Sequence, residues 1–182
     1  MLEIEIIQKE ISIGEKYRIL INGQETYKAA SRIFRLFPYV EVKPLWQDTV
    51  LLAIEMQFGF LEPQFTFSIG LKQYDLETIS WWKNRYAVNT DKGRMEIVGH
   101  RGRKVSILLN GSQIAWFESD ALSVLSGDRY KMIAKENSPQ EWLIAIMLFW
   151  DNYYNRKDKG LINFSFGRFN QSQPFDKDWQ PF

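Results

Sequence analysis

One run of nine apolar residues, Trp142 to Trp150, constrains the fold of this 182-residue chain more than any other feature. In a helix these side chains point in every direction, so about two and a half turns have no polar face. Protein or lipid must therefore surround the run. The positions that we expect to form the structural centre of the fold are Trp142, Leu143, Ile146, Met147, Phe149 and Trp150.

The flanks of the run predict a helix over residues 139–157. Ser138 can accept a hydrogen bond at the helix start, Pro139 suits the first helical position, and Glu141 completes a capping box. Spanning a membrane takes about 20 apolar residues, more than twice the length of this run. We therefore expect a buried helix and no transmembrane span.

The residues before the helix read almost entirely as β-strands. Apolar and polar residues alternate in segments such as 2–6 and 105–109, and Asn22-Gly23 and Asn110-Gly111 are strong hairpin signals. We expect about twelve strands, one of them at 121–125, with a further strand over 161–169. The two Asn-Gly hairpins resemble each other, which leaves two readings open: ordinary hairpins, or two related halves divided near residues 71–80.

Together these elements predict a mainly β fold, a closed antiparallel barrel of about twelve strands around one central helix. A helix with its side chains is about 10–12 Å across, and a barrel needs about eleven strands or more to enclose one. Closure also removes exposed sheet edges. We expect residues 1–169 to form this single domain, and residues 170–182 to form a polar, aromatic tail that docks weakly or stays disordered.

Composition limits the classes of function. The chain carries 23 basic and 22 acidic residues, a net charge of +1, which argues against a general nucleic-acid binder. It has no cysteine, so disulfides, zinc–thiolate sites and cysteine nucleophiles are excluded. The N-terminus alternates acidic and apolar side chains, unlike a signal peptide, and we expect a cytoplasmic protein that can associate peripherally with membranes.

Two stretches carry a resemblance to a known family: residues 17–29, Tyr-Arg-Ile-Leu-Ile-Asn-Gly-Gln-Glu-Thr-Tyr-Lys-Ala, and the hydrophobic helix from Glu141 to Asp151. In an antiparallel chain of this length they resemble the tubby C-terminal-domain-like fold, a group that includes the LURP-one-related proteins and the phospholipid scramblases. The resemblance covers most of residues 1–169, and the strand after the helix departs from it. It implies association with membrane phospholipids or phosphoinositides, or a scaffold role. No motif here matches the group's lipid-contacting residues position by position.

Residues suited to catalysis are few. No nucleophile elbow, zinc-protease motif, phosphate-binding loop or dinucleotide fingerprint is present. We interpret His100, the single histidine, as a solvated loop residue, and place Asp151 at the barrel mouth rather than beside a buried cation. We expect no enzyme, cofactor or metal, and read the acidic pairs as solvent-facing rather than as metal or glycosidase sites. These pairs are Glu118 with Asp120, Asp75 with Glu77, and Asp176 with Asp178.

Two surface segments could bind a lipid. The first, residues 101–104, places three cations near a turn, where they could hold a phosphate or headgroup; a soluble loop is the alternative. The second, residues 81–86, alternates so that one set of aromatic and basic side chains can face a membrane interface. The candidate residues are Arg101, Arg103, Lys104, Trp81, Lys83 and Arg85.

We therefore predict a non-enzymatic barrel whose partner is an anionic phospholipid or another protein. Because the helix fills the barrel, any ligand must bind outside it. A calycin-like carrier of a small hydrophobic ligand is the main alternative, and it requires an empty interior with the helix packed outside. A hydrolase that uses the scattered carboxylates is a minor alternative.

Overall fold

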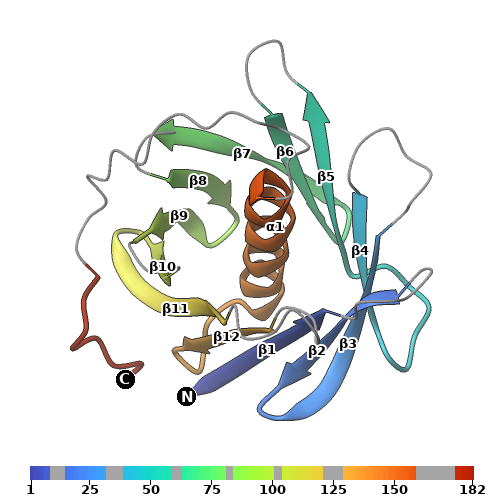
Figure 1. Cartoon of the computed structure of the whole chain (residues 1–182), viewed down its shortest axis with the longest axis horizontal. Coiled ribbons are helices and arrows are strands. Elements are labelled where there is room, and N and C mark those ends of the chain that lie inside the picture. Colours follow the sequence, from blue (N-terminus) through green and yellow to red (C-terminus); the bar gives the residue numbers. More distant parts are fainter. Residues whose placement is uncertain are drawn as a thin grey trace.

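The computed structural model describes residues 1–8, 15–31, 39–58, 63–80, 84–100, 104–120, 129–158 and 175–182. In these ranges twelve strands surround one helix (Figure 1). The strands are β1 (Leu2–Gln8), β2 (Glu15–Ile21), β3 (Gln24–Ser31), β4 (Tyr39–Pro44), β5 (Leu52–Phe58), β6 (Pro63–Ile69), β7 (Lys72–Ser80), β8 (Arg85–Thr90), β9 (Gly93–Gly99), β10 (Lys104–Leu109), β11 (Ser112–Asp120) and β12 (Arg129–Ala134). The helix is α1 (Gln140–Asp158).

The strands form a closed barrel in sequence order. Each strand pairs antiparallel with the next, and β1 closes the ring against β12, where Ile4 lies opposite Met132. The predicted fold class, a closed antiparallel barrel with a single helix, is confirmed. Closure gives every strand of the ring two neighbours, so no sheet edge is left for another chain to extend.

The two ends of the barrel differ in how the strands are joined. At one end, which we name the turn end, four connections have only two residues: β2–β3, β6–β7, β8–β9 and β10–β11. The β4–β5 connection and the entry to α1 also lie at this end. At the opposite end, which we name the loop end, six longer connections join β1–β2, β3–β4, β5–β6, β7–β8, β9–β10 and β11–β12. Helix α1 runs from the turn end towards the loop end.

The two Asn-Gly hairpins at the turn end share their geometry. Both asparagines have positive φ, 50° for Asn22 and 51° for Asn110, as this tight turn requires. The side-chain oxygen of Asn22 accepts from the Glu3 backbone N–H at 2.9 Å, and that of Asn110 accepts from the Arg94 N–H at 3.0 Å. Each asparagine thus fastens its turn to the strand that lies before the hairpin, β1 for Asn22 and β9 for Asn110. This extends the sequence resemblance to three strands in each unit, β1 to β3 and β9 to β11.

The apolar run of α1 lies inside the barrel, as Figure 1 shows. All nine residues from Trp142 to Trp150 are buried, none with more than 7% of its surface exposed. Aromatic rings of the barrel strands contact rings of the helix edge-on. The ring centres of Phe65 and Phe149 are 4.8 Å apart, and so are those of Tyr74 and Trp142. Burial of so many large side chains contributes on the order of 10 kcal/mol or more before the entropy of folding is counted.

The strand prediction needs one correction. The sequence pattern did not predict a strand over residues 72–80, and these residues form strand β7. Tyr74 and Leu76 pack towards the core while Asp75 and Glu77 are exposed, so the segment has the period of a strand. The pattern is weak in the sequence because only these two inward positions are strongly apolar. The strands predicted at 121–125 and 161–169 lie outside the described residues.

The helix begins without the predicted capping hydrogen bond. The hydroxyl of Ser138 is buried and has no hydrogen-bond partner. Instead, the Ser138 N–H donates to the Lys135 carbonyl at 3.1 Å, and the Leu143 N–H donates to the Pro139 carbonyl at 3.1 Å. A tight turn after β12, rather than a side-chain cap, therefore directs the chain into the barrel.

Gly99 provides a test of how tightly the helix fits. A Cβ atom there would lie 2.8 Å from Cη2 of Trp150 and 2.9 Å from Cβ of Asn84. We expect Gly99→Ala to lower the free energy of unfolding by about 1–3 kcal/mol, because the closed barrel cannot expand locally. Urea denaturation measures this, with Ser112→Ala on an exposed strand position as the control. Adding Trp150→Phe should restore part of the loss; the same stability for Gly99→Ala and wild type would contradict the tight fit.

Candidate functional site

A buried polar cluster follows the apolar run of α1. The carboxylate of Asp151 is 2% exposed and accepts hydrogen bonds from the hydroxyls of Tyr17 on β2 and Tyr130 on β12. Lys16 Nζ in turn donates to the Tyr17 hydroxyl at 2.8 Å. The prediction that Asp151 avoids burial by lying at the barrel mouth is therefore wrong. Two phenols supply the hydrogen bonds that a buried carboxylate needs.

Burial and charge favour the protonated form of the Tyr17 hydroxyl, which donates the hydrogen bond to Asp151. Burial, and after it the negative charge of Asp151, raises the pKa of Tyr17 well above its ordinary value of 10.0. Hydrogen bonding by Asn152 opposes this effect without overcoming it. Tyr17 therefore remains a neutral donor at ordinary pH. The cluster ties α1 to β2 and β12, the two neighbours of β1, and so anchors the helix in the barrel.

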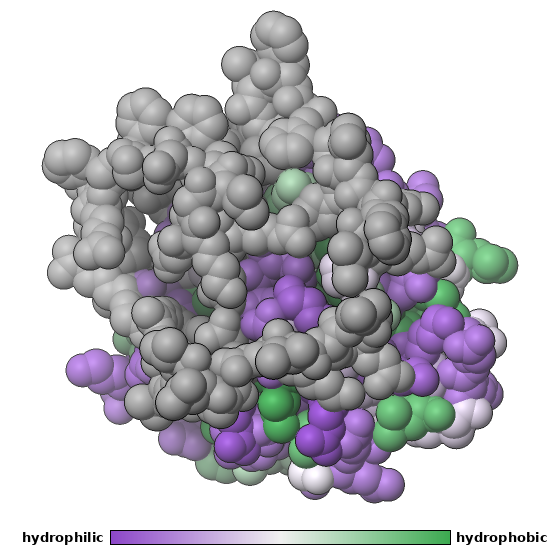
Figure 2. All heavy atoms as spheres, turned by 45° about the vertical axis from the view of Figure 1, so that its right-hand side comes forward, coloured by the Kyte–Doolittle hydropathy of each residue, from purple (hydrophilic) through white to green (hydrophobic). Residues whose placement is uncertain are grey.

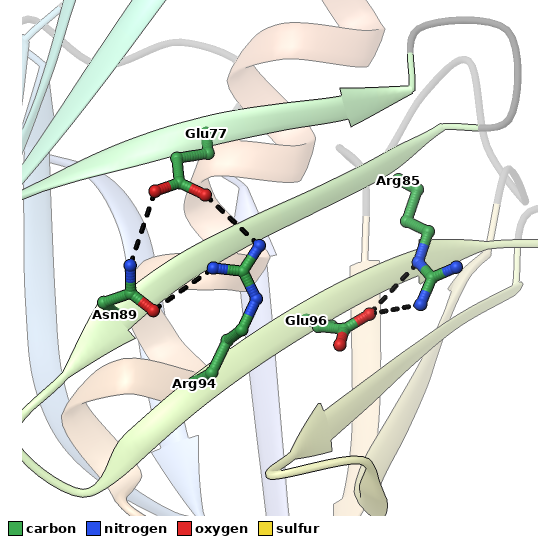
Figure 3. Close-up of polar contacts among 5 residues, drawn as sticks. All are labelled: Glu77, Arg85, Asn89, Arg94 and Glu96. Atoms are coloured by element: carbon green, nitrogen blue, oxygen red, sulfur yellow. Dashed lines mark hydrogen bonds and ion pairs between the residues drawn. The ribbon is translucent and has the colours of Figure 1, made fainter.

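Arg85, one of the predicted lipid ligands, takes part in an ion-pair network on the outer face of β7 to β9 (Figure 3). It donates to Oε2 of Glu96 from Nε at 3.1 Å and from Nη2 at 2.5 Å. Beside this pair, Glu77 accepts from Asn89 at 3.4 Å and from Arg94 at 3.2 Å. These contacts link neighbouring strands, so Arg85 and Glu77 help to stabilise the pairing of β7, β8 and β9.

Lys104, a second predicted ligand, lies among aromatic rings on the outer face of β10 and β11. Its Nζ is 5.6 Å from the ring centre of Trp116, 4.8 Å from that of Phe175, and 3.9 Å from a carboxylate oxygen of Glu118. The ring of Phe175 meets Trp116 at 5.3 Å and His100 at 5.4 Å. The C-terminal segment thus packs against the barrel next to a lysine that the sequence had marked for lipid.

His100 differs from its predicted role as a solvated residue. Its side chain is half-buried, with Nε2 2.9 Å from the hydroxyl of Ser106. A hollow of about 170 Å³ lies along the C-terminal segment, with Trp116, Phe175 and Trp179 in its lining. The sequence did not predict the contacts of Phe175 with His100, Trp116 and Lys104. A single phenylalanine in a polar segment does not indicate which strand it will contact.

The remaining candidates, Trp81, Lys83, Arg101 and Arg103, lie outside the described residues. The strands that flank these two segments, β7 to β10, are described and are consecutive neighbours in the barrel. Residues 81–84 connect β7 to β8, residues 100–103 connect β9 to β10, and β8 pairs with β9. The Gly99 N–H donates to the Asn84 carbonyl at 2.9 Å, which joins the two connections where they begin and end.

The described ranges contain no gathering of three histidine, aspartate or glutamate side chains that could hold a metal ion. Among the predicted acidic pairs, Asp75 accepts from the Thr66 hydroxyl at 2.9 Å, and the side chain of Asp120 is outside the described set. No helix within those ranges has both the length and the apolar character to cross a membrane. No family model, curated protein or solved structure matches the chain.

The raised pKa of Tyr17 predicts a specific loss of stability in alkali. Above about pH 10 the tyrosine ionises in the unfolded chain but stays protonated in the folded one, so the unfolded state binds fewer protons and becomes favoured. Each such group lowers the free energy of unfolding by up to about 1.4 kcal/mol per pH unit until its folded pKa is reached.

We therefore expect Tyr17→Phe to unfold more readily than wild type at pH 8, by about 1–3 kcal/mol, because a hydrogen bond to a carboxylate is lost. Between pH 10 and 11 the stability of the variant should fall less steeply than that of wild type. Urea denaturation at each pH measures both effects. Parallel declines in the two proteins would mean that Tyr17 ionises equally in the folded and unfolded chains.

Proposed function

We propose that the chain is a non-enzymatic, tubby-like barrel that associates with anionic phospholipid membranes through its loop end. The observation that carries the proposal is the strand order. It brings the two segments that the sequence marks for lipid, near Trp81 and near Arg101, to neighbouring connections of the same end. Cations and aromatic side chains that are about 20 residues apart in sequence can thereby act on one surface.

The composition of the loop end supports an anionic partner. Its six connections, residues 9–14, 32–38, 59–62, 81–84, 100–103 and 121–128, contain six basic and three acidic residues, whereas the whole chain has a net charge of only +1. The same connections carry large apolar residues, including Phe34, Phe37, Phe60 and Trp82. Basic residues contribute about 1 kcal/mol each near an anionic membrane, and aromatic residues favour the interface beside them.

The filled interior restricts ligands to the outer surface. Residues of α1 and of the strands form one buried cluster in which most side chains are fully enclosed. A small-molecule carrier would need the helix outside an empty barrel, and here the helix is inside. Binding on the outside is also what a protein scaffold would use, so lipid binding must be tested directly.

We expect the protein to co-sediment with vesicles that contain anionic phospholipid, and binding to weaken as salt is raised. Arg101→Glu combined with Arg103→Glu should weaken this binding on the order of 30-fold or more, because two attractive charges become repulsive.

The matched control is Lys92→Glu with Lys135→Glu, which makes the same change in charge at the turn end. It should bind nearly as wild type. An absence of pelleting at every salt concentration, or an equal loss in both double variants, would count against the loop-end proposal.

A further inference from the structure

Four large apolar side chains are exposed together at the turn end, opposite the proposed loop-end contact. Their exposed fractions are 44% for Leu45, 67% for Trp46, 38% for Val50 and 105% for Leu71. The first three belong to the β4–β5 connection and the fourth to the β6–β7 turn, and we name the four the apolar rim. Figure 2 brings the side of β3 to β5 forward and shows hydrophobic atoms among hydrophilic ones along the right-hand and lower parts of the described surface.

Backbone hydrogen bonds hold the two connections of the rim together. The Leu51 N–H donates to the Val42 carbonyl at 2.9 Å, and the Gly70 N–H donates to the Leu51 carbonyl at 3.2 Å. Gly70 has a φ of +60°, which lets a two-residue turn present Leu71 at its tip. The ring of Trp46 lies beside that of Tyr27, with 6.3 Å between ring centres and 43° between their planes, and Trp46 is 67% exposed.

Lysines border the rim. Lys43 forms an ion pair with Asp48 at 2.7 Å, Lys28 lies opposite Lys43 on the neighbouring strand, and Lys72 follows Leu71 in the chain. Hydrogen bonding and charge from Lys43, with a smaller effect from Lys28, lower the pKa of Asp48. The surroundings of the rim therefore include these three lysines and the carboxylate of Asp48.

We propose that the apolar rim inserts into the interfacial layer of a phospholipid bilayer. Tryptophan, aliphatic tips and lysines together suit that layer, because their apolar parts leave water while the ammonium groups stay in it. A second copy of the chain fits less well. A standard protein interface buries about 800 Å² per partner, and one aromatic ring of about 150–250 Å² with three exposed aliphatic side chains offers less. Hot spots of protein interfaces also lie in packed pockets, whereas these residues project.

This insertion does not rest on the loop-end proposal. It depends on the burial of apolar surface, so it does not require an anionic lipid. Neutral vesicles therefore test the rim alone, and anionic vesicles with the arginine variants test the loop end.

The absence of cysteine allows one label at one chosen position. We would attach an environment-sensitive fluorophore to Leu71→Cys and, as the matched control, to Ile79→Cys, which is 42% exposed on β7 outside the rim. With neutral phosphatidylcholine vesicles, the label at position 71 should shift to shorter wavelength and become shielded from an aqueous quencher. The label at position 79 should stay in water. Trp46→Ser in the Leu71→Cys background should raise the lipid concentration for half-maximal shift by about tenfold.

Two results would overturn the proposal. One is a label at position 71 that stays in water with neutral vesicles, or that responds no more than the label at position 79. The other is a shift that occurs without vesicles and grows with protein concentration, which would mean that a second copy covers the rim. Neither readout depends on whether Arg101 and Arg103 bind anionic lipid.

Discussion

A helix with no polar face is stable in water only where other parts of the chain cover it on every side. The run from Trp142 to Trp150 imposes that condition, and the closed ring of twelve strands satisfies it. Other features of the sequence are explained by this enclosure of the helix. Gly99 lacks a side chain where the indole of Trp150 approaches the strand, and aromatic rings such as Phe65 and Tyr74 fill the space around the helix edge-on. The interior that the structure describes is therefore filled by packed side chains of the helix and the strands.

The two ends of the barrel differ in their connections, and the helix enters at the turn end and runs towards the loop end. At the turn end, four of the five connections between strands have only two residues, and a tight turn at Ser138 leads into the helix. Towards the loop end the apolar run stops at Asp151, and two tyrosines from β2 and β12 hold that carboxylate inside the barrel. Long connections are tolerated beyond this anchor, since the core they surround is already closed. The strand order thus separates an end where most connections are two-residue turns from an end where each connection has four residues or more.

The enclosure of the helix could be predicted from the sequence because both of its parts are local patterns: an apolar run and repeated alternation. Strand β7 was missed where the alternation was carried by polar residues, and the cap at Ser138 was wrong because the turn from β12 supplied the local hydrogen bonds instead. The partners of Asp151 could not be predicted. Tyr17 is 134 residues away in the chain, and no local spacing records such a contact. The contact between Phe175 and Lys104 could not be predicted for the same reason. The exposure of Trp46 and Leu71 depends on the shape of two turns, which is set by the fold as a whole.

The most direct test of the enclosure is an alanine series around the circumference of α1, read out by the free energy of unfolding in urea. The five substitutions, each at a fully buried residue and together covering every direction of the helix, are Leu143→Ala, Ile144→Ala, Ile146→Ala, Leu148→Ala and Phe149→Ala. If barrel strands surround the helix, every variant should lose about 2–5 kcal/mol. Losses below about 0.5 kcal/mol at two neighbouring directions would show that one side of the helix faces water, and the account of a helix-filled barrel would be contradicted.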